Sequence, residues 1–278
     1  LQETTGKATD TLSVEEIIQK TYRETDASMS QNGKGRHSGT TAISVFQFGK
    51  SNEKEKNPFN PNVLYIANVG DSTIILINSL TGDVLYRNKP HKPHLPEESK
   101  RIKEMGGQVI EPPWFNPQAT SRVLKKRSGI EGDINDLEPG VGLALAMSRS
   151  IGDLFLGEVA GVIPDPTVNV LDISEYQQQV RTNDSSNGKN HDNGSFLFVV
   201  LATDGLLDFV PAEEVAMALS HTINNKSNSA TNTASASSYI ELTKTCEKLI
   251  QKASNLWKIE TNNYRDDITM AVHPVFVE

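Results

Sequence analysis

The sequence predicts an α+β fold, in which helices come between groups of strands. Segments such as "NVLYIANVG", "STIILIN" and "SFLFVVLAT" are rich in β-branched and aromatic residues, as buried strands are. Segments with helical periodicity, such as "PEESKRIKEMGG" and "PAEEVAMALSHTI", stand between groups of these strands. Strict alternation of strands with helices would instead favour a doubly wound parallel sheet.

The first expected element is a helix that begins after Ser13. Ser13 and Glu16 have the spacing of a capping box, and the apolar residues from Val14 to Tyr22 recur on one helical face. This helix should run into a turn at residues 28–35. Strands are then expected at 40–48, 62–70 and 72–78, and the last continues through "SLTGD" into "VLYR" as a hairpin.

The rest of the sequence predicts further strands and three helices. A helix over residues 96–107 begins with proline and acids and ends in glycine, which are sensible helix ends. Strands are expected at 141–147, 167–173, 195–203 and 267–275, and helices at 211–223 and 238–257.

Polar segments interrupt this pattern near residues 51–62, 177–195 and 224–238. Their composition cannot bury enough apolar surface to offset the entropy of ordering, so surface loops are expected there and not linkers between domains. Residues 1–278 are therefore interpreted as a single domain.

Composition limits the function. The formal net charge is -8 and there is no basic cluster, which argues against nucleic-acid binding. An acidic protein that handles phosphate needs a recruited cation. Cys246, the only cysteine, can form no disulfide within the chain, which favours a reducing compartment. No stretch reaches the roughly 18 apolar residues of a membrane span. We expect an intracellular protein, cytoplasmic or nuclear.

Aspartates stand at the ends of several expected strands. Asp71 lies in "VGDS", where it is either a turn residue or a cation ligand. Asp204 ends a strand that is apolar throughout, so its carboxylate should lie deep in the core, where it needs a charged partner or a metal. Asp266 and Asp267 precede an alternating strand, and one of them should point inward.

These residue types favour a hard cation. Aspartates with Ser and Thr nearby, without a His or Cys cluster, suit Mg²⁺ or Mn²⁺ better than Zn²⁺. His91 and His94 are three residues apart, but the prolines around them exclude a helical pairing, so they are not interpreted as metal ligands.

Six motifs carry a family resemblance. "HSGTTA", "YIANVGDS", "HKPHLPEESKRIKEMGGQV", "AMSRSIGD", "LATDGLLD" and "RDDIT" occur in this order across residues 37–269. In content, order and spacing the sequence resembles the metal-dependent, type 2C serine/threonine protein phosphatases. The resemblance implies a four-layer α-β-β-α sandwich of two antiparallel sheets flanked by helices. It also implies a cleft at one end of the sheets with two Mg²⁺ or Mn²⁺ ions.

The resemblance assigns roles to individual aspartates. Asp204 and Asp266 match the metal ligands, and Asp267 stands where the family usually has Asn. Asp71 matches an acid that helps to hold a third, weaker metal. Asp208 and Asp153 match acidic positions that support the centre or the local fold.

The implied activity is hydrolysis of phosphoserine and phosphothreonine in phosphoprotein substrates by a monomeric enzyme. The region of residues 111–161 corresponds to a variable flap. Within it, Lys125, Lys126 and Arg127 are either a solvated charge run or an attractor for acidic phosphopeptides.

One departure from the family is large. No Arg in an early strand and no Asp-Gly-His-Gly-Gly motif precedes "SGTTA", so no phosphate-binding Arg or general-acid His is identified in this chain. Two explanations stay open: an N-terminal segment is missing from the sequence, or the protein is an inactive pseudophosphatase that acts as a binding module. The retained Asp71, Asp204 and Asp266 favour the first, and residues 1–278 alone are then expected to be inactive.

Overall fold

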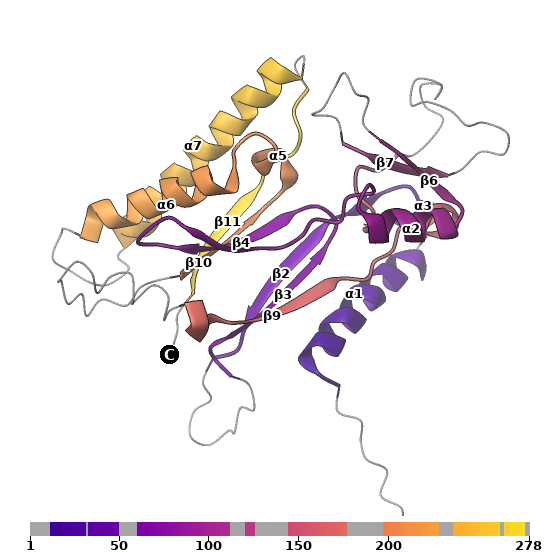
Figure 1. Cartoon of the computed structure of the whole chain (residues 1–278), viewed down its shortest axis with the longest axis horizontal. Helices are drawn as coiled ribbons and strands as arrows, with labels where there is room; N and C mark the ends of the chain where they lie inside the picture. Colours follow the sequence, from indigo (N-terminus) through magenta and orange to yellow (C-terminus); the bar gives the residue numbers. More distant parts are fainter. Residues whose placement is uncertain are drawn as a thin grey trace, which may run out of the picture.

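Two antiparallel sheets lie face to face at the centre of the molecule in the computed structural model (Figure 1). The structure describes residues 12–31, 33–49, 60–111, 120–125, 144–176, 197–227, 236–261 and 264–275. The four-stranded sheet has the order β11–β10–β4–β5 and the three-stranded sheet the order β2–β3–β9. Their strands are β2 Ala42–Gln47, β3 Val63–Val69, β4 Thr73–Asn78, β5 Val84–Arg87, β9 Thr167–Asp172, β10 Leu197–Ala202 and β11 Met270–Val275.

The apolar strands are buried on both faces. In β4, Ile74 and Leu76 face the other sheet, whereas Ile75 and Ile77 face the helices. Successive side chains of a strand point to opposite faces, so a strand covered on both sides must be apolar at every position. This explains why "STIILIN" and "SFLFVVLAT" show no alternation.

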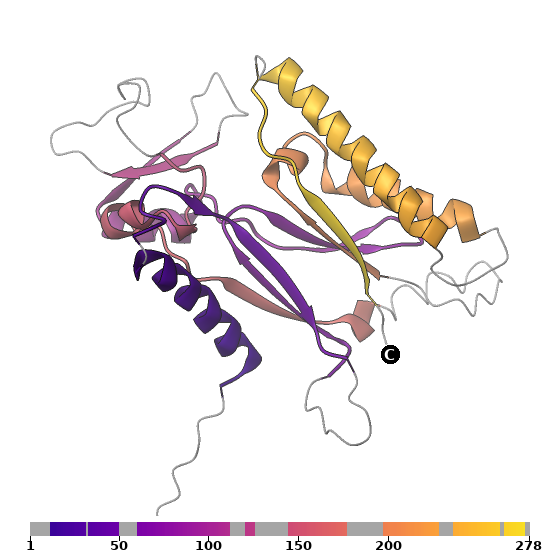
Figure 2. The ribbon, with the colours of Figure 1, turned by 180° about the vertical axis from the view of Figure 1, so that it is seen from behind.

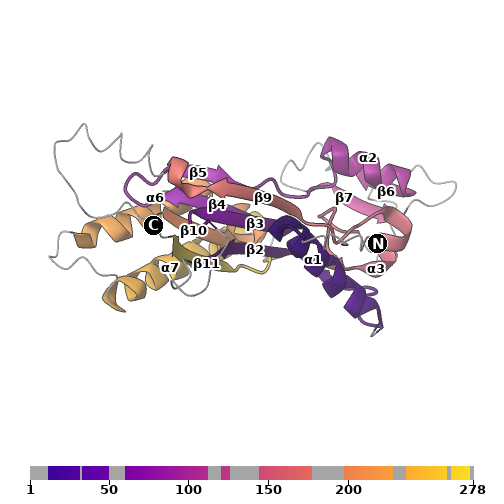
Figure 3. The same cartoon turned by 90° about the horizontal axis from the view of Figure 1, so that it is seen from below.

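Helices cover the outer face of each sheet (Figures 2 and 3). α6 (Ala212–Ser227) and α7 (Ala236–Glu260) pack on the four-stranded sheet through a shared apolar cluster. α1 (Val14–Gln31) packs on the three-stranded sheet through Ile18 and Tyr22. The expected α-β-β-α sandwich is therefore confirmed.

The start of α1 has the expected capping box. The backbone N–H of Ser13 donates to Oε2 of Glu16 over 2.7 Å, and the backbone N–H of Glu16 donates to Oγ of Ser13 over 3.2 Å. These bonds satisfy backbone donors that a helix start otherwise leaves unpaired.

A smaller unit packs beside the sandwich. It contains α2 (Pro96–Glu104), a hairpin of β6 (Gly107–Ile110) and β7 (Arg122–Lys125), and α3 (Leu154–Ala160). These elements share an apolar cluster, which is centred on Ile102, Val123, Leu156, Ala160 and Val162. The short pair β1 (Gly39–Thr40) and β8 (Ile151–Gly152) and the single turn α5 (Asp204–Leu207) are further described elements.

Several sequence expectations need correction. The strand expected at 141–147 is wrong over 144–147, where only Leu145 forms an isolated bridge with Val123, and 141–143 lie outside the described residues. The helix expected over 96–107 ends at Glu104, because Gly106, with φ 85°, turns the chain into β6. The elements β6, β7 and α3 were not expected, since their apolar stretches are too short to show a period.

The polar insertions are narrower than expected where the structure describes them. Residues 224–227 belong to α6 and 236–238 to α7. The whole of 177–195, with 51–59 and 228–235, lies outside the described residues. In the described part of the chain, each helix is too short or too polar to cross a membrane.

Candidate functional site

Sheet register brings the strand-end aspartates together. In the four-stranded sheet Ala202 of β10 pairs with Thr73 of β4 on one side and with Met270 of β11 on the other. Asp71 precedes Thr73, Asp204 follows Ala202, and the 266–267 pair precedes Met270. Because the strands are antiparallel, all of these positions leave the same end of the sheet.

Asp71 lies where the chain crosses from one sheet to the other. β3 ends at Val69 in the three-stranded sheet, and β4 begins at Thr73 in the four-stranded sheet. Gly70 has φ 92°, and a Cβ there would overlap the side chain of Thr41. Asp71 is only 6% exposed. It is therefore a turn residue, as one interpretation proposed, but its carboxylate is buried and needs a partner.

Lys92 provides that partner. Its Nζ lies 2.6 Å from Oδ2 of Asp71 and 3.3 Å from Oδ2 of Asp204, so one ammonium joins the two carboxylates. The Lys92 side chain is 15% exposed, that of Asp71 7% and that of Asp204 25%. Lys92 was not among the residues predicted for the site, because nothing in "HKPH" indicates that this lysine lies inside the protein.

The charges in this group shift one another's pKa values. Burial raises the pKa of Asp71 to about 6, where the attraction of Lys92 opposes the rise and the charge of Asp204 adds to it. Burial alone would lower the pKa of Lys92, but Asp71, Asp204 and Asp208 outweigh it and raise that pKa. The lysine is therefore a permanent cation at neutral pH.

Two further aspartates extend the acidic group. The surrounding protein removes part of the hydration of Asp208, and with the charge of Asp204 it raises the pKa of Asp208 to about 6, although the side chain stays exposed. Asp266 contributes to the same rise and is half-buried, whereas Asp267 is exposed. This difference agrees with the expectation that one of the two aspartates, Asp266 or Asp267, points inward.

Hydrogen bonds from side chains to backbone carbonyls hold the loop of Asp204 against the loop of Asp266 and against α7. Oγ1 of Thr203 donates to the carbonyl of Asp267 over 2.9 Å, and Nε1 of Trp257 donates to the carbonyl of Gly205 over 2.6 Å. A Cβ at Gly205 would overlap the carbonyl of Asp267. The glycine after Asp204 therefore permits the close approach of the two loops.

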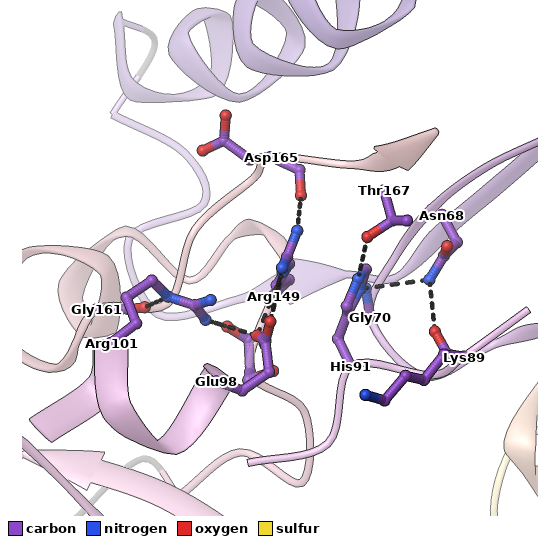
Figure 4. A network of polar contacts seen from close by, with 11 residues as sticks. Asn68, Gly70, Lys89, His91, Glu98, Arg101, Arg149, Gly161, Asp165 and Thr167 are labelled. Carbon is purple, nitrogen blue, oxygen red and sulfur yellow. Dashed lines mark hydrogen bonds and ion pairs between the residues drawn. The ribbon is translucent and has the colours of Figure 1, made fainter. Parts of the chain in front are cut away.

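His91 holds the turn that carries Asp71 (Figure 4). Nδ1 of His91 accepts the backbone N–H of Gly70 over 3.2 Å and the side-chain amide of Asn68 over 3.3 Å. Nε2 must then carry the proton, and it donates to Oγ1 of Thr167 over 2.8 Å. Both ring nitrogens of His91 are thus used in hydrogen bonds that hold this turn.

A buried ion-pair network is centred on Glu98 (Figure 4). Glu98 of α2 accepts from Arg149 over 2.6 Å, from Arg101 over 2.8 Å and from Oγ of Ser148 over 2.5 Å. Burial opposes ionisation of Glu98, but these donors outweigh it and lower its pKa to about 2. Arg149 also donates to the carbonyl of Asp165, so the network joins α2 to the segment before β9.

The predicted site residues occupy unequal environments. The expectation of a deeply buried Asp204 is wrong, because a quarter of its side chain is exposed, while Asp71 is the buried member. Asp153 is 4% exposed, has φ 50° and accepts a hydrogen bond from Oγ of Ser150 over 2.6 Å. Those contacts give Asp153 a local structural role.

Only part of a metal ligand set is present among the described residues. In that portion of the chain, no three His, Cys, Asp or Glu side chains are placed to hold one ion together. Nevertheless the donors are carboxylate oxygens, which fit a hard cation. Asp71 and Asp204 already share the ammonium of Lys92, and the charges of Asp204 and Asp266 both raise the pKa of Asp208.

The sandwich and the acidic group at the end of its sheets define a class, that of the type 2C phosphatase fold. The chain belongs to the protein phosphatase 2C family, whose model matches residues 2–255. It is 34% identical to "Probable protein phosphatase 2C 12" of Oryza sativa subsp. japonica over 64% of this chain and 35% of that protein. It is 33% identical to "Protein phosphatase 1L" of Bos taurus over 54% of this chain and 30% of that protein.

Solved structures show the same fold. The serine-threonine phosphatase 2C of Toxoplasma gondii has a TM-score of 0.56 and 17% identity, over 93% of this chain and 66% of that chain. A sex determining protein of C. elegans has a TM-score of 0.55 and 16% identity, over 98% of this chain and 49% of that chain. The chain spans about a third of the length of the curated relatives it matches.

Proposed function

We propose that this protein is a metal-dependent serine/threonine phosphatase that hydrolyses phosphoserine and phosphothreonine in phosphoproteins. Membership of the protein phosphatase 2C family supports the reaction class. The observation that carries the proposal to this chain is the convergence of Asp71, Asp204 and Asp266 at one end of the four-stranded sheet.

In this proposal, Asp204 and Asp266 hold Mg²⁺ or Mn²⁺ at the two main positions, and Asp71 serves a third, weaker one. When bound, these ions would lower the pKa of a water molecule and offset negative charge on the phosphoryl group during hydrolysis. The chain's own residues keep the carboxylates in place: Thr203 and Gly205 fix the loops of Asp204 and Asp266 against each other.

The substrate is expected to approach from the side of the smaller unit. Lys125, at the end of β7, places Nζ 6.0 Å from the ring centroid of Phe155 in α3. Arg36 lies over the same ring at 5.8 Å but also pairs with Glu158 over 3.5 Å. In an acidic protein the charge of Lys125 favours an anionic ligand. Lys126 and Arg127 lie outside the described residues.

One observation favours a second candidate function. The ammonium of Lys92 already pairs with Asp71 and Asp204 and offsets one of their two negative charges, an arrangement that would suit a pseudophosphatase that binds partners without turnover. The two functions differ in whether added metal produces hydrolysis.

The test is release of phosphate from a phosphothreonine peptide by the full-length protein with Mn²⁺. We expect activity in the wild type and its loss in Asp204→Asn and Asp266→Asn. The matched control is Asp267→Asn, which changes the exposed neighbour of Asp266 and should keep wild-type activity. Hydrolysis that survives in Asp266→Asn would contradict the site, and a wild type without activity would favour the pseudophosphatase.

A further inference from the structure

The cation between Asp71 and Asp204 belongs to the chain itself. Nζ of Lys92 lies within ion-pair distance of both carboxylates, and the side chain is mostly buried with them. A second cation cannot occupy the same space, and the lysine reduces the net charge of the two carboxylates from -2 to -1, which weakens their attraction for a divalent ion. The lysine and a metal would therefore exclude each other at this place.

The lysine is held there by its neighbours in the chain. The backbone N–H of His91 donates to the carbonyl of Gly70 over 2.9 Å, and the backbone N–H of Gly70 donates to Nδ1 of His91. Lys92 follows His91 as Asp71 follows Gly70, so this reciprocal pair places the lysine beside the aspartate. Pro90 and Pro93 restrict the backbone on both sides of the histidine and lysine.

We propose that Lys92 is a tethered cation that competes with a divalent metal for Asp71 and Asp204, and that binding of the metal requires the ammonium to leave. This inference rests on the proposed function, because it concerns regulation of the same site. The site is then complete only when the metal concentration is high enough to displace Lys92.

Metal binding tests the competition without an activity assay. We expect Lys92→Met to bind Mn²⁺ about tenfold more tightly than the wild type in isothermal titration calorimetry, because the competing charge is gone. Lys92→Arg keeps the charge and should not gain affinity. The matched control is Lys89→Met, which removes an equal charge from an exposed lysine of the same segment and should bind as the wild type does.

The gain in Mn²⁺ affinity must depend on the Asp71 carboxylate, which pairs with Lys92. Adding Asp71→Asn to Lys92→Met should remove it. Equal or weaker Mn²⁺ binding by Lys92→Met would overturn the proposal, and so would an equal gain in Lys89→Met. If Lys92→Met does not fold without metal, Lys92→Gln keeps a polar end and takes its place.

A second measurement uses the wild type alone. An amine-reactive reagent, followed by mass spectrometry, should label Lys92 slowly without metal and faster with saturating Mg²⁺, while labelling of Lys89 stays constant. An unchanged rate at Lys92 when Mg²⁺ is bound would show that the lysine does not leave and would overturn the proposal. Loss of hydrolysis with intact metal competition would instead count against the proposed function, so the two failures are distinguishable.

Discussion

His91 and Gly70 bind each other twice, once through the backbone of the histidine and once through Nδ1 of its ring. The turn that carries Asp71 and the segment that carries Lys92 therefore move as one unit. His91 is 5% exposed, and the other nitrogen of its ring contacts Thr167 at the start of β9. One neutral imidazole thus ties the crossing between the two sheets to a third strand.

The buried imidazole should make stability depend on pH. Burial and the nearby Arg149 and Arg101 lower the pKa of His91 from 6.5 to about 4, against an opposing effect of Glu98. The unfolded chain therefore takes up this proton first as pH falls, so stability present above pH 6.5 is lost toward pH 4. Between pH 7.5 and 5 we expect a loss of about 2 kcal/mol from this residue in urea unfolding.

A non-titrating variant isolates this contribution. His91→Asn keeps an acceptor near the position of Nδ1, so its free energy of unfolding should fall less between pH 7.5 and 5 than that of the wild type. His94→Asn, in the same segment but exposed, is the control and should retain the wild-type slope. Identical slopes for His91→Asn and the wild type would contradict the assigned neutral state.

Removal of the Glu98 carboxylate should be costly. Glu98→Gln leaves Arg149 and Arg101 without their buried counter-charge, and loss of one partner of such a group costs about 3–5 kcal/mol. Urea unfolding measures the difference, with Glu97→Gln on the exposed side of the same helical turn as the control. A loss below about 1 kcal/mol would place this network among surface ion pairs.

Gly205 should tolerate no side chain. In Gly205→Ala the new Cβ overlaps the carbonyl of Asp267, so the loops of Asp204 and Asp266 must separate. We expect a loss of about 1–3 kcal/mol in the free energy of unfolding and weaker Mn²⁺ binding. Gly49→Ala, where a Cβ meets open space, is the control and should stay within about 0.5 kcal/mol of the wild type. Unchanged Mn²⁺ binding in Gly205→Ala would show that the metal site does not require the close approach of the two loops.

Asp71 should be distinguishable from the two main ligands. In the full-length protein, Asp71→Asn should raise the Mn²⁺ concentration for half-maximal turnover by about tenfold, while the tightest metal site survives in calorimetry. The physical reason is the loss of one anionic oxygen from a weaker position. Loss of the tightest site would make Asp71 a main ligand. An unchanged dependence of turnover on Mn²⁺ concentration would show that Asp71 is only a turn residue.

Local chemistry determined much of this protein from the sequence alone. The capping box at Ser13 and Glu16 and the β4–β5 hairpin follow from interactions between residues close in the chain, and the fully apolar strands indicated two covered sheet faces. The order of six motifs indicated the phosphatase family, which the family model confirms. Asp71, Asp204 and Asp266 were identified as candidates because each follows or precedes an apolar strand.

Only the tertiary structure decided how these residues meet. The register of β4, β10 and β11 brings the strand-end aspartates to one end of a sheet, and it cannot be read from any one strand. Lys92 is 21 residues from Asp71 and 112 from Asp204, so no local pattern could pair them. Burial depends on the whole fold in the same way. The sequence predicted that Asp204 lies deep in the core, whereas the crossing between the sheets buries Asp71, because that turn lies between two packed layers.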